Sequence, residues 1–320
     1  MWSGIEDGSL LPCLTRLYIA KCPKLQEAPP LYARPKVEVV ITSDSKPSSC
    51  LFDSLMASAS YLILLVNCCS FLSSLNTDQL SHVEELNVKS CTDPMPACGF
   101  IGLSSLKVLR ISNCSALLSS VCVEAGEELD TCFFPQSLSE LEIVDCNIQS
   151  SLLPRYLQGL TNLSVLVINS CDSMDLLSLA YGPHHLTSLE AIIIKDCIFL
   201  SSLDGFENLI ALRKLVVADC KNFCFLPADL NALISLKTLA IYGCPKMKFL
   251  PQNGVPASLQ LILLSLLHPE LDRQLQRREG TEWDKIAHVP EKKLEVCSAC
   301  YLFPSYSDGV RCSYRLTYCM

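Results

Sequence analysis

Residues 235–251 read SLKTLAIYGCPKMKFLP, and the spacing of their apolar residues decides the fold. Leu236, Leu239 and Ile241 lie eight, five and three positions before Cys244, and Met247 lies three positions after it. Leu239 and Ile241 are two residues apart, so on a β-strand their side chains point to the same face. One short strand cannot bury both unless a neighbouring segment packs against it. The stretch therefore predicts one unit of a repeating structure.

The same phrase, L-x-x-L-x-I-x-x-C, recurs along most of the chain. Its cysteine stands at Cys22, Cys69, Cys91, Cys114, Cys146, Cys171, Cys197, Cys220 and Cys244. From Cys69 to Cys244, successive cysteines lie 22 to 32 residues apart. A degenerate copy around Val37, Val39 and Ile41 fills the long first interval, and a last copy carries Leu267 in place of cysteine. We count about eleven repeats.

A period of about 20–29 residues built on this phrase is typical of leucine-rich repeats. We therefore expect an α/β repeat fold. It should be a curved right-handed solenoid with a parallel β-sheet on the concave face and an irregular or short helical convex side. Strands about 4.8 Å apart would make the stack about 50 Å long. We assign residues 1–13 to the remnant of an upstream repeat, 14–290 to the solenoid and 291–320 to a disordered, cysteine-containing tail.

The chain has 20 cysteines, and their use bears on the cellular compartment. The nine repeat cysteines suit a tight buried turn, because cysteine behaves as a small hydrophobe with a weak S–H donor. We expect Cys171, Cys197, Cys220 and Cys244 to be buried free thiols. The opening residues, MWSGIEDGSLL, lack the basic and apolar regions of a signal peptide. These features favour the reducing cytoplasm, or the nucleus, over an extracellular disulfide scaffold.

Composition and motifs give little support to other chemistry. The net charge of −8 argues against a nucleic-acid groove, and the apolar run at 61–72 is too short to span a bilayer. No catalytic or cofactor motif occurs, so we expect no enzyme activity, no cofactor and no metal. We interpret His184 and His185 as loop residues. Cys297, Cys300, Cys312 and Cys319 have spacing that fits zinc poorly.

The outward face of the strands carries the best candidate for a binding site. The residue four positions before each cysteine should point to the concave surface, and from Val167 onward this position is apolar. The candidate protein-binding residues are Val165, Val167, Ile193, Lys195, Lys214, Val216, Ala240 and Tyr242. A contiguous apolar surface commonly marks a partner site. The alternative interpretation is that β-branched residues simply favour strands.

Three stretches carry a resemblance to a known family: CPKL at 22–25, the unit at 235–251 and REGTEWDKIAHVP at 278–290. They resemble the last repeats of plant nucleotide-binding leucine-rich-repeat disease-resistance proteins of the coiled-coil class. The resemblance covers roughly residues 2–296. It implies a non-catalytic recognition module of plant defence, whose partner would be a pathogen effector, a host protein or a nucleotide-binding switch domain.

The chain also departs from that family. It has no G-x-x-x-x-G-K-[ST] motif and no coiled-coil heptads, so nucleotide switching is not carried over and we expect a truncated member. Residues after Val296 match nothing in the family. Two alternatives stay open: a leucine-rich-repeat substrate adaptor of the ubiquitin system, whose helix phrase and F-box we do not find, and a non-functional gene fragment.

Overall fold

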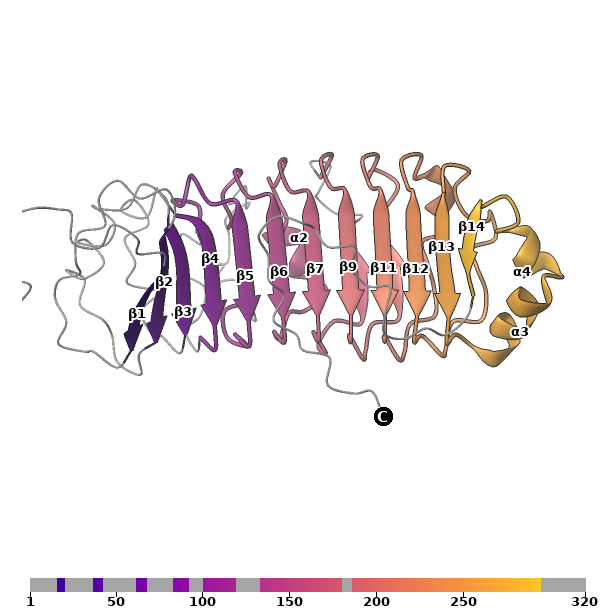
Figure 1. Ribbon diagram of the computed structural model, residues 1–320, viewed down its shortest axis with the longest axis horizontal. Coiled ribbons are helices and arrows are strands. Elements are labelled where there is room, and N and C mark those ends of the chain that lie inside the picture. Colours follow the sequence, from indigo (N-terminus) through magenta and orange to yellow (C-terminus); the bar gives the residue numbers. More distant parts are fainter. Residues whose placement is uncertain are drawn as a thin grey trace, which may run out of the picture.

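A computed structural model describes residues 83–91, 100–118, 133–179 and 186–294, together with the strands at 16–20, 37–42 and 62–67. Within these residues the dominant element is one parallel sheet of twelve short strands. The strands are β1 (Arg16–Ala20), β2 (Val37–Thr42), β3 (Leu62–Asn67), β4 (Val83–Lys89), β5 (Val108–Ser112), β6 (Glu140–Val144), β7 (Val165–Asn169), β9 (Ala191–Lys195), β11 (Lys214–Ala218), β12 (Thr238–Tyr242), β13 (Leu261–Ser265) and β14 (Glu291–Lys293). Figure 1 shows them side by side in chain order.

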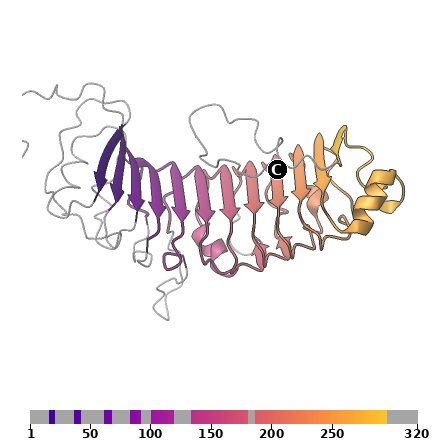
Figure 2. The same ribbon diagram turned by 60° about the horizontal axis from the view of Figure 1, so that its bottom comes forward.

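The strand register confirms the predicted repeat. Leu215 of β11 pairs with Ile192 of β9 on one side and with Leu239 of β12 on the other, so equivalent residues of successive repeats lie next to one another. The degenerate copy also forms a strand, β2, between β1 and β3. The chain is therefore a leucine-rich-repeat solenoid whose strands line the concave side (Figure 2).

The core lies directly beneath the sheet. Leu109, Ile111, Leu239 and Ile241, which the sequence predicts to point inward, have no exposed surface. Most alternate residues of these strands are partly exposed, although Ala240 of β12 is buried, and Tyr18 of β1 is 62% exposed. Because each coil buries aliphatic side chains against the coils before and after it, the buried residues from Val83 to Val289 form one continuous core.

The convex side contains more regular structure than we expected. It carries α2 (Leu153–Tyr156), η3 (Leu230–Ala232) and a second, two-stranded parallel sheet of β8 (Leu176–Ser178) and β10 (Ser202–Asp204). Figure 1 places α2 behind β6 and β7. An isolated bridge from Ser202 to Phe225 extends the second sheet by one repeat. The predicted short helical segments are present, whereas this small sheet was not foreseen.

A compact segment closes the stack at its carboxyl-terminal end. Helices α3 (Pro269–Arg277) and α4 (Thr281–Asp284) follow β13, and β14 then adds the last strand to the sheet (Figure 1). Ile286 is fully buried, and Trp283 packs partly buried against the core. Strand β14 lies beyond residue 290, where the sequence analysis ended the solenoid.

Candidate functional site: the concave face of the sheet

The concave face is built from the strand positions six, four and two residues before each repeat cysteine. On β9 these are Ala191, Ile193 and Lys195. Parallel pairing aligns each of them with its counterparts on β7 and β11, so the face consists of three rows that run across the strands. The sequence alone predicts which residues belong to each row, and the stack determines which of them meet.

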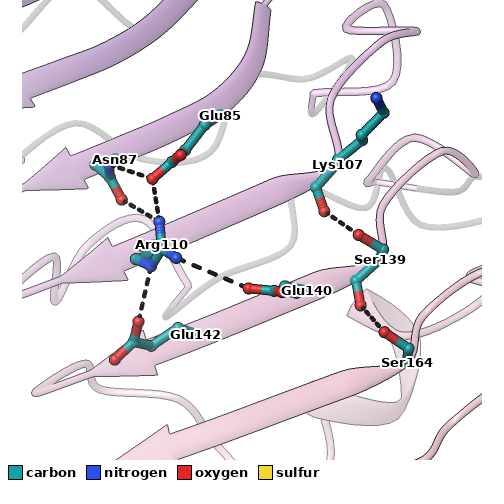
Figure 3. Close-up of polar contacts among 8 residues, drawn as sticks. All are labelled: Glu85, Asn87, Lys107, Arg110, Ser139, Glu140, Glu142 and Ser164. Carbon is teal, nitrogen blue, oxygen red and sulfur yellow. Dashed lines mark hydrogen bonds and ion pairs between the residues drawn. The ribbon is translucent and has the colours of Figure 1, made fainter. Parts of the chain in front are cut away.

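An ion-pair network occupies this face on β4 to β6, centred on Arg110 (Figure 3). Its Nη1 donates to a carboxylate oxygen of Glu85, and its Nε lies 3.1 Å from Oε2 of Glu142. Nη2 lies 3.8 Å from Oε2 of Glu140. Asn87 lies in the same network, because its Nδ2 donates to Glu85 at 3.4 Å. Three carboxylates thus surround one guanidinium, and this part of the face, which we call the acidic zone, carries an excess of negative charge.

Side-chain hydrogen bonds also hold the starts of these strands together. The Ser139 hydroxyl donates to the backbone carbonyl of Lys107 at 3.0 Å, and the Ser164 hydroxyl donates to the carbonyl of Ser139 at 2.9 Å (Figure 3). Each serine links its own coil to the preceding one. These bonds add side-chain links between coils to the backbone ladder of the sheet.

From β7 onward the outward strand positions are mostly apolar, although Lys195 and Lys214 also lie on this face. We call this surface the apolar patch: Val165, Val167, Ile193, Val216, Ala218, Ala240, Leu261 and Leu263. Val216, Ala218 and Ala240 form a buried cluster of their own, separate from the main core. Ile193, Leu263 and Tyr242 pack against that cluster and stay partly buried. The strand register brings the candidate binding residues named from the sequence onto one face, but Val216 and Ala240 are only 4% and 8% exposed.

The two long edges of the apolar patch differ in charge. At the strand starts lie Arg213, Lys214 and Lys237, which we call the basic edge. At the strand ends lie Asp196 and Asp219. Burial raises the pKa of the Asp219 carboxyl above its ordinary value, and the neighbouring charge of Asp196 raises it further. Lys214 is one of the binding residues predicted from the sequence, whereas Arg213, Lys237, Asp196 and Asp219 were not predicted, because each edge is formed by residues of different repeats.

Two polar groups beside the apolar patch are only partly satisfied. Burial lowers the pKa of the half-buried Lys214 ammonium, and no described acceptor or carboxylate pairs with it. The buried hydroxyl of Tyr242 has no hydrogen-bond partner among the described residues. Its pKa is raised by burial first and then by the charges of Asp219 and Asp196. Unpaired polar groups at an apolar surface favour a binding partner that supplies a hydrogen-bond acceptor or an opposite charge.

The repeat cysteines lie beneath the face and take no part in it. Cys91, Cys114, Cys146, Cys171, Cys197, Cys220 and Cys244 are buried, and none of these seven forms a disulfide. The side chains of Cys22 and Cys69, like His184, His185, Cys297, Cys300, Cys312 and Cys319, lie outside the described residues. Within the described ranges, no group of three or more His, Cys, Asp or Glu side chains could hold a metal ion. No helix there is long and apolar enough to cross a membrane.

Comparisons with known proteins agree with this architecture. No family model matches the chain. The "Putative disease resistance protein At4g19050" of Arabidopsis thaliana is 26% identical over 251 residues, which are 77% of this chain and 20% of that protein. The disease resistance protein RPS4B of the same plant is 24% identical over 205 residues, which are 60% of this chain and 16% of that protein. The chain thus spans about a fifth or less of the length of these relatives.

A solved structure supports the fold independently. The leucine-rich-repeat domain of the type III effector XCV3220 (XopL) superimposes with a TM-score of 0.54 and 23% identity, covering 82% of this chain and 79% of that one. This likeness concerns the fold alone. The repeat phrase and the solenoid identify the chain as a leucine-rich-repeat protein, and its sequence is similar to that of plant disease-resistance proteins.

Proposed function

We propose that this chain is a non-catalytic protein-recognition module of plant defence, and that its concave face is the contact surface. The partner would be a pathogen effector, a host protein or a nucleotide-binding switch domain, met in the cytoplasm or the nucleus. The names of the plant relatives support the role in defence. The solenoid supports recognition, because stacked repeats present extended concave surfaces of the kind that repeat proteins use to bind.

The apolar patch is the observation that carries this proposal. Its residues are contributed by β7, β9, β11, β12 and β13, so it is contiguous across neighbouring strands. The strand fold needs inward aliphatics but does not need outward ones, which on β4 to β6 are largely charged or polar. Contiguous apolar surface rimmed by polar residues commonly marks a protein-binding site.

The test is capture of proteins from healthy and infected leaf extracts by the purified chain. Ile193→Lys combined with Leu263→Lys places two charges on the apolar patch at partly exposed positions. Val216 is a poorer choice for such a substitution, because at 4% exposure a lysine would also disturb packing. We expect this double variant to lose proteins that the parent captures while its circular dichroism spectrum stays unchanged.

The matched control is Phe225→Lys combined with Phe249→Lys. These phenylalanines lie after their strands, away from the concave face, and are 65% and 62% exposed. The control also replaces two large apolar residues by lysine, so it corrects for the general effect of added charge. If the parent chain, the concave-face double variant and this control captured proteins equally, the concave face would not be the contact surface.

A further inference from the structure

The basic edge of the apolar patch is formed by successive coils. The amide of Arg213 donates to the carbonyl of Glu190 at 2.8 Å, and the amide of Lys237 donates to the carbonyl of Arg213 at 2.8 Å. Residues at this row are therefore stacked at the strand spacing of about 4.8 Å. Arg213 and Lys237 lie in this row with one carboxylate, that of Glu190, and Lys214 follows Arg213 directly as the first residue of β11.

Lys214 is the cation of this edge that lies within the sheet. It pairs with Ala191 of β9 and Thr238 of β12, neither of which offers a carboxylate. Its ammonium is half-buried, and desolvation lowers its pKa with no described counter-ion to compensate. An ammonium partly withdrawn from water gains from an anion brought beside it, since the pair restores the lost electrostatic stabilisation.

The charged residues elsewhere on the concave face do not favour a basic partner at the basic edge. The carboxylates of the acidic zone already surround Arg110 and lie on β4 to β6, whereas the basic edge lies on β11 and β12. The whole chain carries a net charge of −8, so a local excess of cations beside the apolar patch departs from its general character. Electrostatic complementarity of this kind selects partners and suppresses wrong ones.

We propose that the apolar patch and the basic edge together bind an acidic, apolar protein segment. Its Asp or Glu carboxylate would sit on Lys214, and its apolar side chains would cover Ile193 and Leu263. This inference rests on the proposed function and adds the chemistry of the partner. Because Lys214 lies two residues from Val216 on the same strand, one short segment can reach both the cation and the patch.

The experiment is selection of binders from a random peptide library displayed on phage, with the folded chain as bait. We expect the selected peptides to combine Asp or Glu with large apolar residues. A synthetic copy of the strongest binder should then bind the Lys214→Gln variant about tenfold more weakly than the parent. The control variant Lys248→Gln removes an exposed lysine outside the concave face and should bind like the parent.

Three outcomes separate this inference from the proposed function. The proposal of an acidic partner would be wrong if the selected peptides were not enriched in Asp or Glu. It would also be wrong if the Lys214→Gln variant bound the peptide as tightly as the parent. If such peptides still lost binding to Ile193→Lys with Leu263→Lys, the concave face would remain the recognition surface. Failure to select any peptide sensitive to either variant would count against both proposals.

Discussion

At the scale of single residues, cysteine suits the repeat turn because its side chain is small and its thiol is a weak hydrogen-bond donor. The Cys146 thiol donates to the carbonyl of Val144 in its own coil at 3.3 Å and approaches the carbonyl of Ile111 in the preceding coil at 3.8 Å. Cys171 makes the same two contacts, to Asn169 and Ile143. A small buried thiol can therefore donate to the carbonyls of this turn.

These thiols make stability depend on pH in the alkaline range. Burial raises the pKa of Cys146, Cys171 and Cys244 from 9.0 to about 12. Between these values the unfolded chain has lost thiol protons that the folded chain keeps, so the free energy of unfolding should fall as pH rises. The loss approaches about 1.4 kcal/mol per pH unit for each thiol. Urea unfolding between about pH 8 and pH 11 measures it.

The variant Cys171→Ala is the control for this pH dependence. It removes one titrating thiol, so its stability, although lower at neutral pH because of the lost contacts, should fall less steeply above about pH 9. If the slopes of parent and variant coincide, Cys171 does not titrate with a raised pKa in the folded state.

At the scale of one element, the turn after each strand depends on a left-handed residue. The residue directly before the cysteine has a positive φ in every described repeat: Ser90, Asn113, Asp145, Ser170, Asp196, Asp219, Gly243 and, before Leu267, Leu266. Its amide donates to the next coil, as Asp145 does to the carbonyl of Asn169 at 2.9 Å. Asn, Asp and Gly tolerate this conformation, whereas leucine does not. The turn thus continues the hydrogen-bond ladder of the sheet beyond the strands.

Leu266 is the residue of this series least suited to the left-handed conformation; its φ is 52°, and 47% of its surface is exposed. We expect Leu266→Asn to raise the free energy of unfolding by about 1 kcal/mol, because asparagine adopts the left-handed conformation at lower cost. Thermal and urea denaturation measure the change. The reverse substitution, Asn113→Leu at φ of 51°, should destabilise by at least as much, since it also removes the bond to Ser90. A lower stability for Leu266→Asn would show that the exposed leucine contributes packing that outweighs its strain.

At the scale of the whole molecule, the stack needs a terminal cover, and α3, α4 and β14 supply it. Glu282 of α4, only 5% exposed, accepts the amide of Leu250 at 2.7 Å and pairs with Lys285 at 2.7 Å. Lys285 in turn donates to the carbonyl of Leu250 at 3.0 Å. Both polar groups of Leu250 are thereby satisfied by one ion pair, which joins the cover to the last loops of the solenoid.

We expect Glu282→Ala to lower the free energy of unfolding by about 3 kcal/mol, because it leaves the partly buried Lys285 without its carboxylate and the Leu250 amide without an acceptor. Urea unfolding followed by circular dichroism measures the loss. The double variant Glu282→Leu with Lys285→Met removes both charges and should cost clearly less than the single substitution. Equal losses for the two variants would mean that the ion pair is not what holds the cover in place.

The amino-acid sequence alone predicts the repeat, the strand of each repeat and the direction of its side chains. These features follow from local alternation: Leu239 and Ile241 are two residues apart, so they share a face whatever surrounds them. The sequence also indicated the outward apolar residues and the buried cysteines. Even the left-handed turn left a signal, because Asn, Asp, Ser or Gly precedes most of the described repeat cysteines.

Only the tertiary structure decided which outward residues meet. Arg110 joins Glu85 and Glu140, which lie 25 and 30 residues away in the chain, because stacking makes β4 and β6 its neighbours. The sheet of β8 and β10 likewise depends on the distance between coils on the convex side. The unpaired charge of Lys214 has the same origin, because whether a carboxylate lies beside it is set by residues of other repeats. Local spacing determines to which face a side chain points, but packing between coils determines which residues of other repeats it contacts.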